Sequence, residues 1–362
     1  MGILSRLGLA SRAVARPEDL RGLTVELSSH CGYDCAPCPL NFYTDTVKRQ
    51  HADAATLIET IESLAPLDVV DFTGWGEGLL HPELLAIVAA ASKAASEVTL
   101  TTAGSLLTEE KARGLIDAGM TYLMVSLDCA SAATYRALKH KDEFELVCEN
   151  VVRVAKLRAG KASPMISLSF VLMQDNLAEA RAFAELAAEL GADQIVFKSV
   201  VPFESAEVGR SVDAHYYAGL DPALALRAQR VIAEAADVAM HAGIEVATFG
   251  DFRSTKRHAC MAYAEQRPFL RADGAVSPCC MAAYPVWRVP REGEARRLEP
   301  VAFGKLGEGS LAAHWAGDDY RNFRKALGDL SAPLPEACRD CPICHNFALN
   351  VRRIPDENEA AL

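Results

Sequence analysis

The chain has 362 residues, half of them hydrophobic, so it can bury one large core or two medium-sized cores. Its 37 lysines and arginines are outnumbered by 48 aspartates and glutamates, which gives a formal net charge of −11. This balance argues against a nucleic-acid partner, because proteins that bind phosphate backbones usually carry a basic stripe. No apolar run reaches the roughly 18–20 residues that cross a bilayer, so we expect a cytoplasmic protein without a membrane partner.

Residues 1–22 form a lead-in without a convincing signal-peptide cleavage site. After it, short strand-like runs alternate with helical patterns. Six βα units in series predict a parallel sheet with helices outside, as an open sheet or a partial barrel. The strand candidates are 23–29, 69–74, 97–104, 122–128, 165–173 and 194–200, and the helical candidates between them are 53–65, 82–95, 108–119, 144–160 and 177–191.

A further helix over 224–243 and a strand over 244–250 follow the last βα unit. After residue 258 the pattern changes, with fewer long helices and more proline and glycine. We therefore predict a first domain over 23–257, a second domain over 258–345, and a solvated tail over 346–362.

Eleven cysteines are many for a protein expected in the cytoplasm, where disulfides are rare. Most fall into two clusters that are separated by a cysteine-poor middle. This distribution indicates two metal sites rather than a disulfide framework. The clusters are Cys31, Cys35 and Cys38, and then Cys260, Cys279, Cys280, Cys338, Cys341 and Cys344; Cys129 and Cys148 stand apart.

The first cluster, "CGYDCAPC", follows the first strand candidate, at the edge where such folds place their chemistry. Three thiolates on one loop suit a 4Fe–4S cluster with one iron open to an external ligand, although a structural zinc knuckle is an alternative. Here the sequence resembles the radical S-adenosylmethionine (SAM) superfamily, whose signature is CxxxCxxC after the first strand of a partial (βα)6 TIM-like barrel. The resemblance implies that Cys31, Cys35 and Cys38 bind a cluster that passes an electron to SAM and releases a 5′-deoxyadenosyl radical.

Two further segments resemble motifs of this family, each after its strand candidate. "GWGEG" (74–78) looks like the family's Gly-Gly-Glu motif; Gly74 and Gly76 would let the backbone approach the methionine amino group, and Glu77 would add an acceptor. "VSLD" (125–128) looks like its Ser-x-Asp segment, which implies that Ser126 helps to hold the SAM carboxylate. The resemblance also implies that Lys139 binds this carboxylate and that Asn176 contacts the ribose.

The sequence departs from the family pattern at two positions. Pro37 precedes the third cysteine, where an aromatic residue or methionine is common, and Tyr33 is our candidate to replace its packing on the adenine. Gly78 replaces a usual proline. Neither change removes a cluster ligand.

The second cysteine cluster resembles the auxiliary-cluster module of the same superfamily, called SPASM, or Twitch in its shorter one-cluster form. The resemblance implies a small cysteine-rich domain that holds a second 4Fe–4S cluster. A zinc site made by the same thiols is the alternative. We expect Cys260, Cys279, Cys338 and Cys341 as ligands, with Cys344 or Cys280 as substitutes and His345 as a weaker alternative.

Three other features have two readings each. Cys129 is either a hydrogen-atom donor to a substrate radical or a small residue that packs in the core. Cys148 lies on an apolar helix face, which favours a core position. The segment 211–219 lines a substrate pocket or forms an exposed loop.

The pattern predicts a radical SAM oxidoreductase that abstracts hydrogen from a C–H bond and completes a two-electron oxidation of a small biosynthetic molecule. Its partners would be that small-molecule or peptide substrate and an electron donor of the flavodoxin or ferredoxin type. Three alternatives stay open: an epimerase with a cysteine hydrogen donor, a maturase of ribosomal peptides, and a non-catalytic zinc or electron-transfer protein.

Overall fold

The computed structural model describes residues 20–199, 203–205, 210–211, 222–249, 260, 262–288, 296–339 and 341. Most of the 211–219 segment, and both Cys344 and His345, lie outside these residues.

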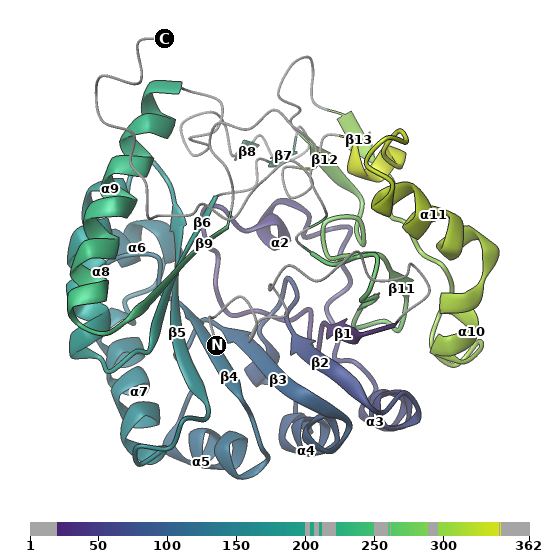
Figure 1. Cartoon of the computed structure of the whole chain (residues 1–362), viewed down its shortest axis with the longest axis horizontal. Helices are drawn as coiled ribbons and strands as arrows, with labels where there is room; N and C mark the ends of the chain where they lie inside the picture. The colour runs from purple at the N-terminus through teal and green to yellow at the C-terminus, as the bar shows by residue number, and fades with distance from the viewer. Residues whose placement is uncertain are drawn as a thin grey trace.

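A curved, mostly parallel sheet organises the described part of the chain, and Figure 1 shows its strands fanning around a common centre. The first six strands are neighbours in chain order and pair in parallel, as the repeated βα units predict. The sheet does not close into a full barrel, so the predicted α/β partial barrel is confirmed. In sheet order the strands are β11 (Val276–Ser277), β10 (Phe269–Leu270), β1 (Gly22–Val25), β2 (Leu67–Phe72), β3 (Ala95–Thr102), β4 (Tyr122–Ser126), β5 (Met165–Leu172), β6 (Gln194–Ser199) and β9 (Glu245–Phe249).

Helices cover the outer face of this sheet, as Figure 1 shows. Local signals in the sequence set several of their boundaries: Asp53 and Thr108 accept backbone hydrogen bonds at helix starts. Gly119 and Gly191 follow helix ends with positive φ angles of 91° and 74°, which other residues rarely adopt. The outer helices are α3 (Ala54–Ser63), α4 (Leu84–Ala94), α5 (Glu109–Asp117), α6 (Ala132–Lys139), α7 (Phe144–Leu157), α8 (Ala180–Glu189) and α9 (Pro222–His241).

Alternate residues of each strand face either the helices or the concave side of the sheet. On β4, Leu123 and Val125 belong to the main core beneath the helices, whereas Tyr122 and Met124 belong to a separate cluster with Val196 of β6. The concave face therefore has its own small apolar floor, in which Tyr122 and Ser167 donate hydrogen bonds to the Gln194 side chain.

The C-terminal part of the chain is built onto the same sheet. β10 pairs in parallel with β1 and forms a hairpin with β11, so the cysteine-rich segment extends the barrel sheet instead of standing apart. Tyr320 packs into the main core beside Phe303, with ring centroids 4.1 Å apart. The remaining elements are α2 (Pro39–Phe42), α10 (Leu311–Ala316), α11 (Asp318–Gly328) and a second sheet of β13 (Arg296–Leu298), β12 (Val286–Arg288), β7 (Phe203–Ser205) and β8 (Arg210–Ser211).

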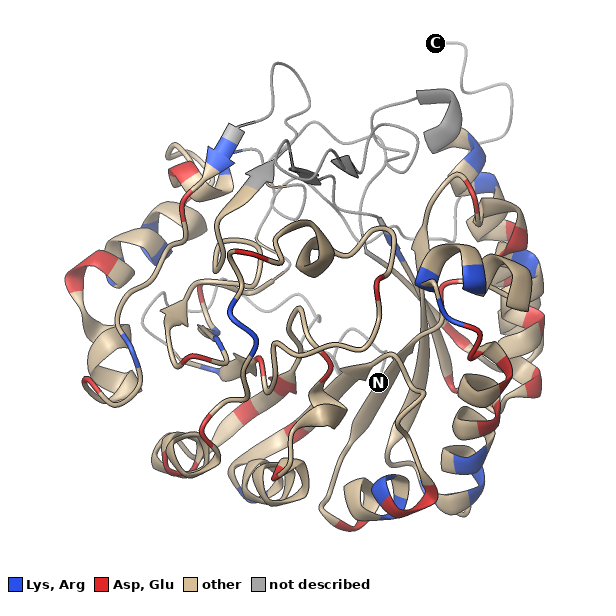
Figure 2. Cartoon of the chain, turned by 180° about the vertical axis from the view of Figure 1, so that it is seen from behind, with Lys and Arg blue, Asp and Glu red and all other residues tan. Residues whose placement is uncertain are grey.

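Charged residues of both signs alternate along the outer helices in Figure 2. Among the described residues, no helix is both long and apolar enough to span a membrane.

Candidate functional site

The loop that carries the first three cysteines runs from the end of β1 to α2. Cys38 is the residue before α2, and its backbone N–H donates to the carbonyl oxygen of Cys35 at 3.1 Å. The side-chain amide of Asn41 donates to the same oxygen, also at 3.1 Å. Pro39 occupies the first helical position, where its missing N–H costs nothing. These contacts turn the chain tightly, so that three thiols come from one short loop.

The three thiols share a partly buried environment. Burial raises the pKa of Cys31, raises that of Cys35 to about 11 and raises that of Cys38 to about 12. The negative charges that Cys31 and Cys35 would carry add to the rise at Cys38, whereas the Lys139 ammonium opposes the rise at all three. Thiolates so placed need a cationic partner to stay deprotonated, and bound iron supplies one.

Three thiols on one loop suit a 4Fe–4S cluster with one iron open to an external ligand. Among the described residues, no group of three His, Cys, Asp or Glu side chains is arranged to hold one metal ion. The predicted ligands Cys31, Cys35 and Cys38 would hold the cluster that SAM binding requires.

The glycine segment 74–78 packs directly against the chain that leads to the cysteines. A Cβ atom on Gly74 would lie 2.5 Å from Cγ of Glu26, and one on Gly76 would lie 2.0 Å from the backbone oxygen of Ser28. Both glycines are thus required by close contact within the protein. Their predicted contact with the SAM amino group stays a prediction.

Glu77 uses its carboxylate to organise this segment. Oε1 accepts from the Leu79 N–H at 3.0 Å and from the Thr102 hydroxyl at 2.8 Å, and Oε2 accepts from the Ala103 N–H at 2.8 Å. The residue is 5% exposed, and its backbone N–H donates to the carbonyl of His30 at 2.7 Å. Glu77 therefore ties β3 to the cysteine loop, while its predicted role as an acceptor for SAM stays a prediction.

Ser126, Asp128 and Lys139 form one buried polar group at the end of β4. Lys139 makes a short ion pair with Asp128, and its Nζ donates to Ser126 Oγ at 3.3 Å. Ser126 Oγ in turn donates to Asp128 Oδ2 at 2.9 Å. Since an ammonium has three hydrogens, one remains for a ligand carboxylate, which agrees with the predicted roles of Ser126 and Lys139. From the sequence, Asp128 was recognised only as the aspartate of the Ser-x-Asp segment, and no role was predicted for it.

The remaining predicted SAM contacts are held by the protein itself. Tyr33 is 9% exposed, and its hydroxyl bonds to Tyr135 at 3.0 Å and to Glu143 at 2.6 Å. Asn176 has no exposed surface, and its two amide hydrogens donate to the carbonyl oxygens of Asp128 and Val171. The predicted contacts of Tyr33 with adenine and of Asn176 with ribose stay predictions, and this placement does not support them.

Cys129 lies within the main core. It has no exposed surface, and its thiol donates to the Leu127 carbonyl at 3.4 Å. Burial raises its pKa, which keeps the thiol protonated. A hydrogen-atom donor must reach the substrate, so this placement favours the packing role.

The second group of cysteines gathers around one small buried cluster. Cys260, Cys338 and Cys341 are each about 5% exposed or less, and Cys279 packs against the same cluster. Burial raises the pKa of Cys279, and the charges that Cys280 and the other three gathered cysteines would carry add to the rise. Four thiols from three separate segments thus meet in one place, which fits the four ligands of a 4Fe–4S cluster.

Cys280 faces the other way from its neighbour. It packs with Cys31 and Cys38 against a cluster that includes Trp75 and Tyr284, whereas Cys279 packs with the second cysteine group. This arrangement supports Cys279 rather than Cys280 as the ligand.

Two charged residues inside the barrel were not singled out from the sequence. Lys198 shares the concave face with Met124, whose sulfur lies 3.0 Å from its Nζ, and burial lowers the pKa of Lys198. Glu26 is 1% exposed and lies just after β1. In the sequence, each of them is a single charged residue within an otherwise apolar strand candidate, and this pattern could have marked both as unusual.

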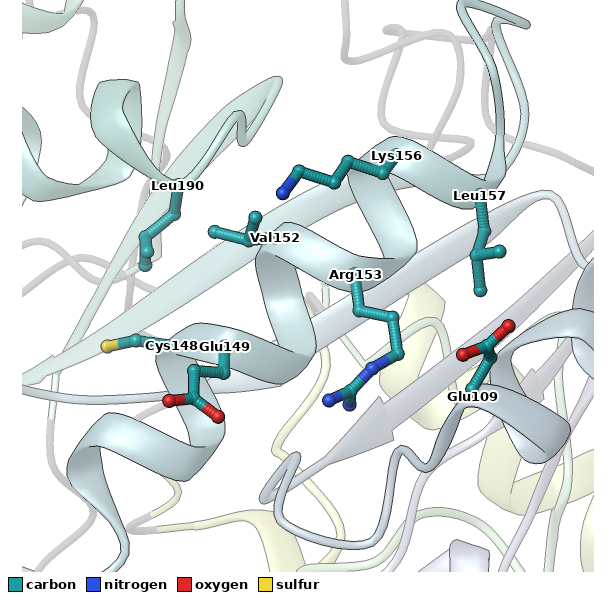
Figure 3. Close-up of a pocket in the computed structure, with 8 residues that line it drawn as sticks. All are labelled: Glu109, Cys148, Glu149, Val152, Arg153, Lys156, Leu157 and Leu190. Atoms are coloured by element: carbon teal, nitrogen blue, oxygen red, sulfur yellow. The ribbon is translucent and has the colours of Figure 1, made fainter.

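Figure 3 shows a groove on the layer of helices that covers the sheet. The residues that line it belong to neither cysteine group. Cys148 lines this groove. Its side chain packs against the main core but is only partly buried, whereas a core position was expected. The groove is lined by Glu109, Cys148, Glu149, Val152, Arg153, Lys156, Leu157 and Leu190.

Two family models match the chain. Residues 25–187 match the radical SAM superfamily, and residues 260–342 match SPASM, an iron–sulfur cluster-binding domain. The first match includes the three-cysteine loop, the glycine segment and the Ser126 group, and the second spans all four gathered cysteines.

Curated relatives cover most of the chain at low identity. The tungsten-containing aldehyde ferredoxin oxidoreductase cofactor-modifying protein of Pyrococcus furiosus is 23% identical over 90% of this chain and 88% of its own. PqqA peptide cyclase of Streptomyces rochei is 26% identical over 93% of this chain and 85% of its own.

Solved structures share the fold. SuiB of Streptococcus suis, bound to SAM, is 15% identical with a TM-score of 0.62 and covers 90% of this chain and 72% of its own. Bound to its precursor peptide SuiA, it has a TM-score of 0.61 and 13% identity and covers 84% of this chain. In that complex this chain spans 66% of the length of SuiB.

Proposed function

Since the chain belongs to the radical SAM superfamily and carries an iron–sulfur cluster-binding domain, we propose that it oxidises a peptide substrate at a C–H bond. One observation carries the proposal: a second, separate set of four cysteines, three buried and one partly buried, accompanies the three-cysteine loop. An enzyme that only abstracts and returns a hydrogen atom does not need a second cluster to accept an electron from its substrate.

When bound, the two clusters supply opposite redox chemistry: one donates the electron that cleaves SAM, and the other accepts the electron that the substrate radical loses. The substrate would lose one hydrogen atom to the 5′-deoxyadenosyl radical, and then one electron and one proton. The chain's own residues hold the reactants: Lys139 and Ser126 bind the SAM carboxylate, and Cys31, Cys35 and Cys38 hold the first cluster. Lys198, on the concave face, is placed to bind a polar group of the substrate.

A peptide is favoured over a small molecule by the relatives. PqqA peptide cyclase is a relative along most of the chain, and SuiB with its precursor peptide shares the fold. The small-molecule substrate expected from the sequence stays an untested alternative. A ferredoxin- or flavodoxin-type electron donor remains part of the proposal.

Coexpression with each short open reading frame that neighbours the gene tests the proposal. The peptide should lose the mass of two hydrogen atoms in a reaction that also yields 5′-deoxyadenosine. A Cys35→Ala variant should give neither product. A peptide whose mass is unchanged in ordinary water but which gains one deuterium in heavy water would instead identify an epimerase.

A further inference from the structure

Glu26 is a buried carboxylate that contacts two distant parts of the chain. It follows β1, and its backbone N–H donates to the Leu270 carbonyl at 2.8 Å, which continues the pairing of β1 with β10. A charged group at 1% exposure is costly unless its oxygens are hydrogen-bonded. Its three hydrogen-bond donors come from two different segments.

One oxygen of Glu26 holds the glycine segment. Oε1 accepts from the backbone N–H of Trp75 at 2.9 Å, in the middle of the Gly74–Gly78 segment. Gly74 lies so close that a Cβ atom there would meet the Glu26 side chain at 2.5 Å. The backbone of this segment is therefore set by the position of Glu26.

The other oxygen holds the C-terminal hairpin. Oε2 accepts a short hydrogen bond from the Tyr284 hydroxyl and a longer one, at 3.3 Å, from the Ala272 N–H. Arg271 lies over the Tyr284 ring, with its guanidinium 4.4 Å from the centroid. Tyr284 lies five residues after Cys279, one of the four gathered cysteines.

Tyr284 and Trp75 are also in direct contact. Their ring centroids are 4.5 Å apart, and both side chains are buried in the cluster that Cys280 packs against. Glu26 and this ring pair thus form one continuous connection from the hairpin of the second cysteine group to the glycine segment. Connections of this kind carry coupling only if both ends can move, which an experiment can decide.

We propose that Glu26 is a positioning residue that couples SAM binding to occupancy of the auxiliary cluster site, acting through Tyr284 and the Trp75 backbone. The inference rests on the proposed role of the Gly74–Gly78 segment in SAM binding. An ordered hairpin would place the Tyr284 hydroxyl on Glu26, and Glu26 would fix the segment that receives the SAM amino group. Loss of the second cluster would then weaken SAM binding, although no residue that contacts SAM is changed.

The SAM dissociation constant of anaerobically reconstituted full-length protein tests this coupling. The variants are Tyr284→Phe, Glu26→Gln, Cys279→Ala and the double variant Tyr284→Phe/Cys279→Ala. Tyr122→Phe is the matched control, because its buried hydroxyl also bonds to a side chain, Gln194, but lies on the barrel floor. Iron content and circular dichroism show that each protein is folded and loaded.

Tyr284→Phe and Glu26→Gln should each weaken SAM binding by about tenfold, the loss of a hydrogen bond to a charged group. Cys279→Ala should weaken it similarly in the wild-type background and add little in the Tyr284→Phe background, because both act through one connection. Tyr122→Phe should stay within about twofold of wild type.

Two results would overturn the coupling: a Tyr284→Phe affinity equal to that of Tyr122→Phe, or an effect of Cys279→Ala that is the same in both backgrounds. If Glu26→Gln fails to fold, Tyr284→Phe still gives the answer. Absence of SAM binding in the wild type would contradict the proposed function itself, and the coupling with it.

Discussion

Lys139 forms a buried ion pair with Asp128, and both side chains are about 7% exposed or less. The pair joins the end of α6 to the turn after β4, where Asp128 has a positive φ of 65°. Asp128 Oδ1 also accepts from the Val171 N–H at 2.8 Å, so one carboxylate organises three segments. The geometry that we assign to the SAM carboxylate site depends on this pair.

Asp128→Asn should lower the free energy of unfolding by about 3–5 kcal/mol, because it leaves the Lys139 ammonium buried without its charge partner. Urea titrations of the anaerobically reconstituted protein measure the change. Asp142→Asn is the control, since it breaks an exposed ion pair with Arg136 of the same helix, α6, in which the two side chains are 60% and 69% exposed. That substitution should cost less than about 1 kcal/mol. Equal losses would show that burial of the Lys139 pair does not matter.

Gly76→Ala should disrupt the cysteine loop, whereas Gly78→Ala should be tolerated. A Cβ atom at Gly76 would meet backbone atoms of Ser28 and His30 at 2.0 and 2.8 Å, which only a shift of the loop can relieve. At Gly78 the nearest atom is the end of the Leu100 side chain at 3.1 Å, which can move. Iron content after reconstitution should fall in the first variant and stay at the wild-type value in the second. The same iron content in both would contradict the argument.

Cys279 and Cys280 are neighbours in sequence with opposite expected effects. Cys279→Ala should remove one cluster, about four iron atoms, because the Cys279 thiol is one of the four gathered cysteines. Cys280→Ala should keep both clusters, because its thiol packs on the Trp75 side. Iron and sulfide analysis decides between them, and loss of iron in Cys280→Ala would reassign the ligand.

Stability should respond to pH through Glu26. Burial is the main cause that raises its pKa above the ordinary value of 4.5. The folded protein then binds this proton more tightly than the unfolded chain, so the contribution of Glu26 to stability falls as pH rises above that value. Glu26→Gln removes this dependence, and the stability of the variant relative to wild type should rise between about pH 5 and about pH 8.

Asp53→Asn is the control for this pH series. The hydrogen bond that Asp53 accepts from Thr56 lowers its pKa below 3.8, so its carboxylate is charged in both states at higher pH. The difference between Asp53→Asn and wild type should therefore stay constant over the same range. A constant difference for Glu26→Gln as well would contradict the assigned shift.

The sequence was sufficient for the parts of the structure that short-range patterns control. The six βα units and the glycines that end α5 and α8 follow from hydrophobic periodicity and helix-end chemistry. The position of β10 beside β1 did not follow, because pairing between segments some 240 residues apart leaves no local signal.

The site shows the same division. The sequence named the seven cysteines that the structure places in two groups and favoured Cys279 over Cys280 as a ligand. It could not show on which side each of these two thiols lies, since that depends on packing. Motif resemblance pointed to Glu77 and Asn176 as SAM contacts, whereas their hydrogen bonds show residues that hold the chain in place. Glu26 had no motif at all, because its partners come together only in the fold.

The central claim is that this chain holds two iron–sulfur clusters in two separate cysteine groups. Iron and sulfide content with Mössbauer spectra, for the anaerobically reconstituted wild type and for a Cys31→Ala/Cys35→Ala/Cys38→Ala variant, tests it most directly. We predict about eight iron atoms in the wild type and about four in the variant, with the remaining cluster in the C-terminal group. Four iron atoms in the wild type and none in the variant would contradict the claim and leave the second cysteine group without a redox role.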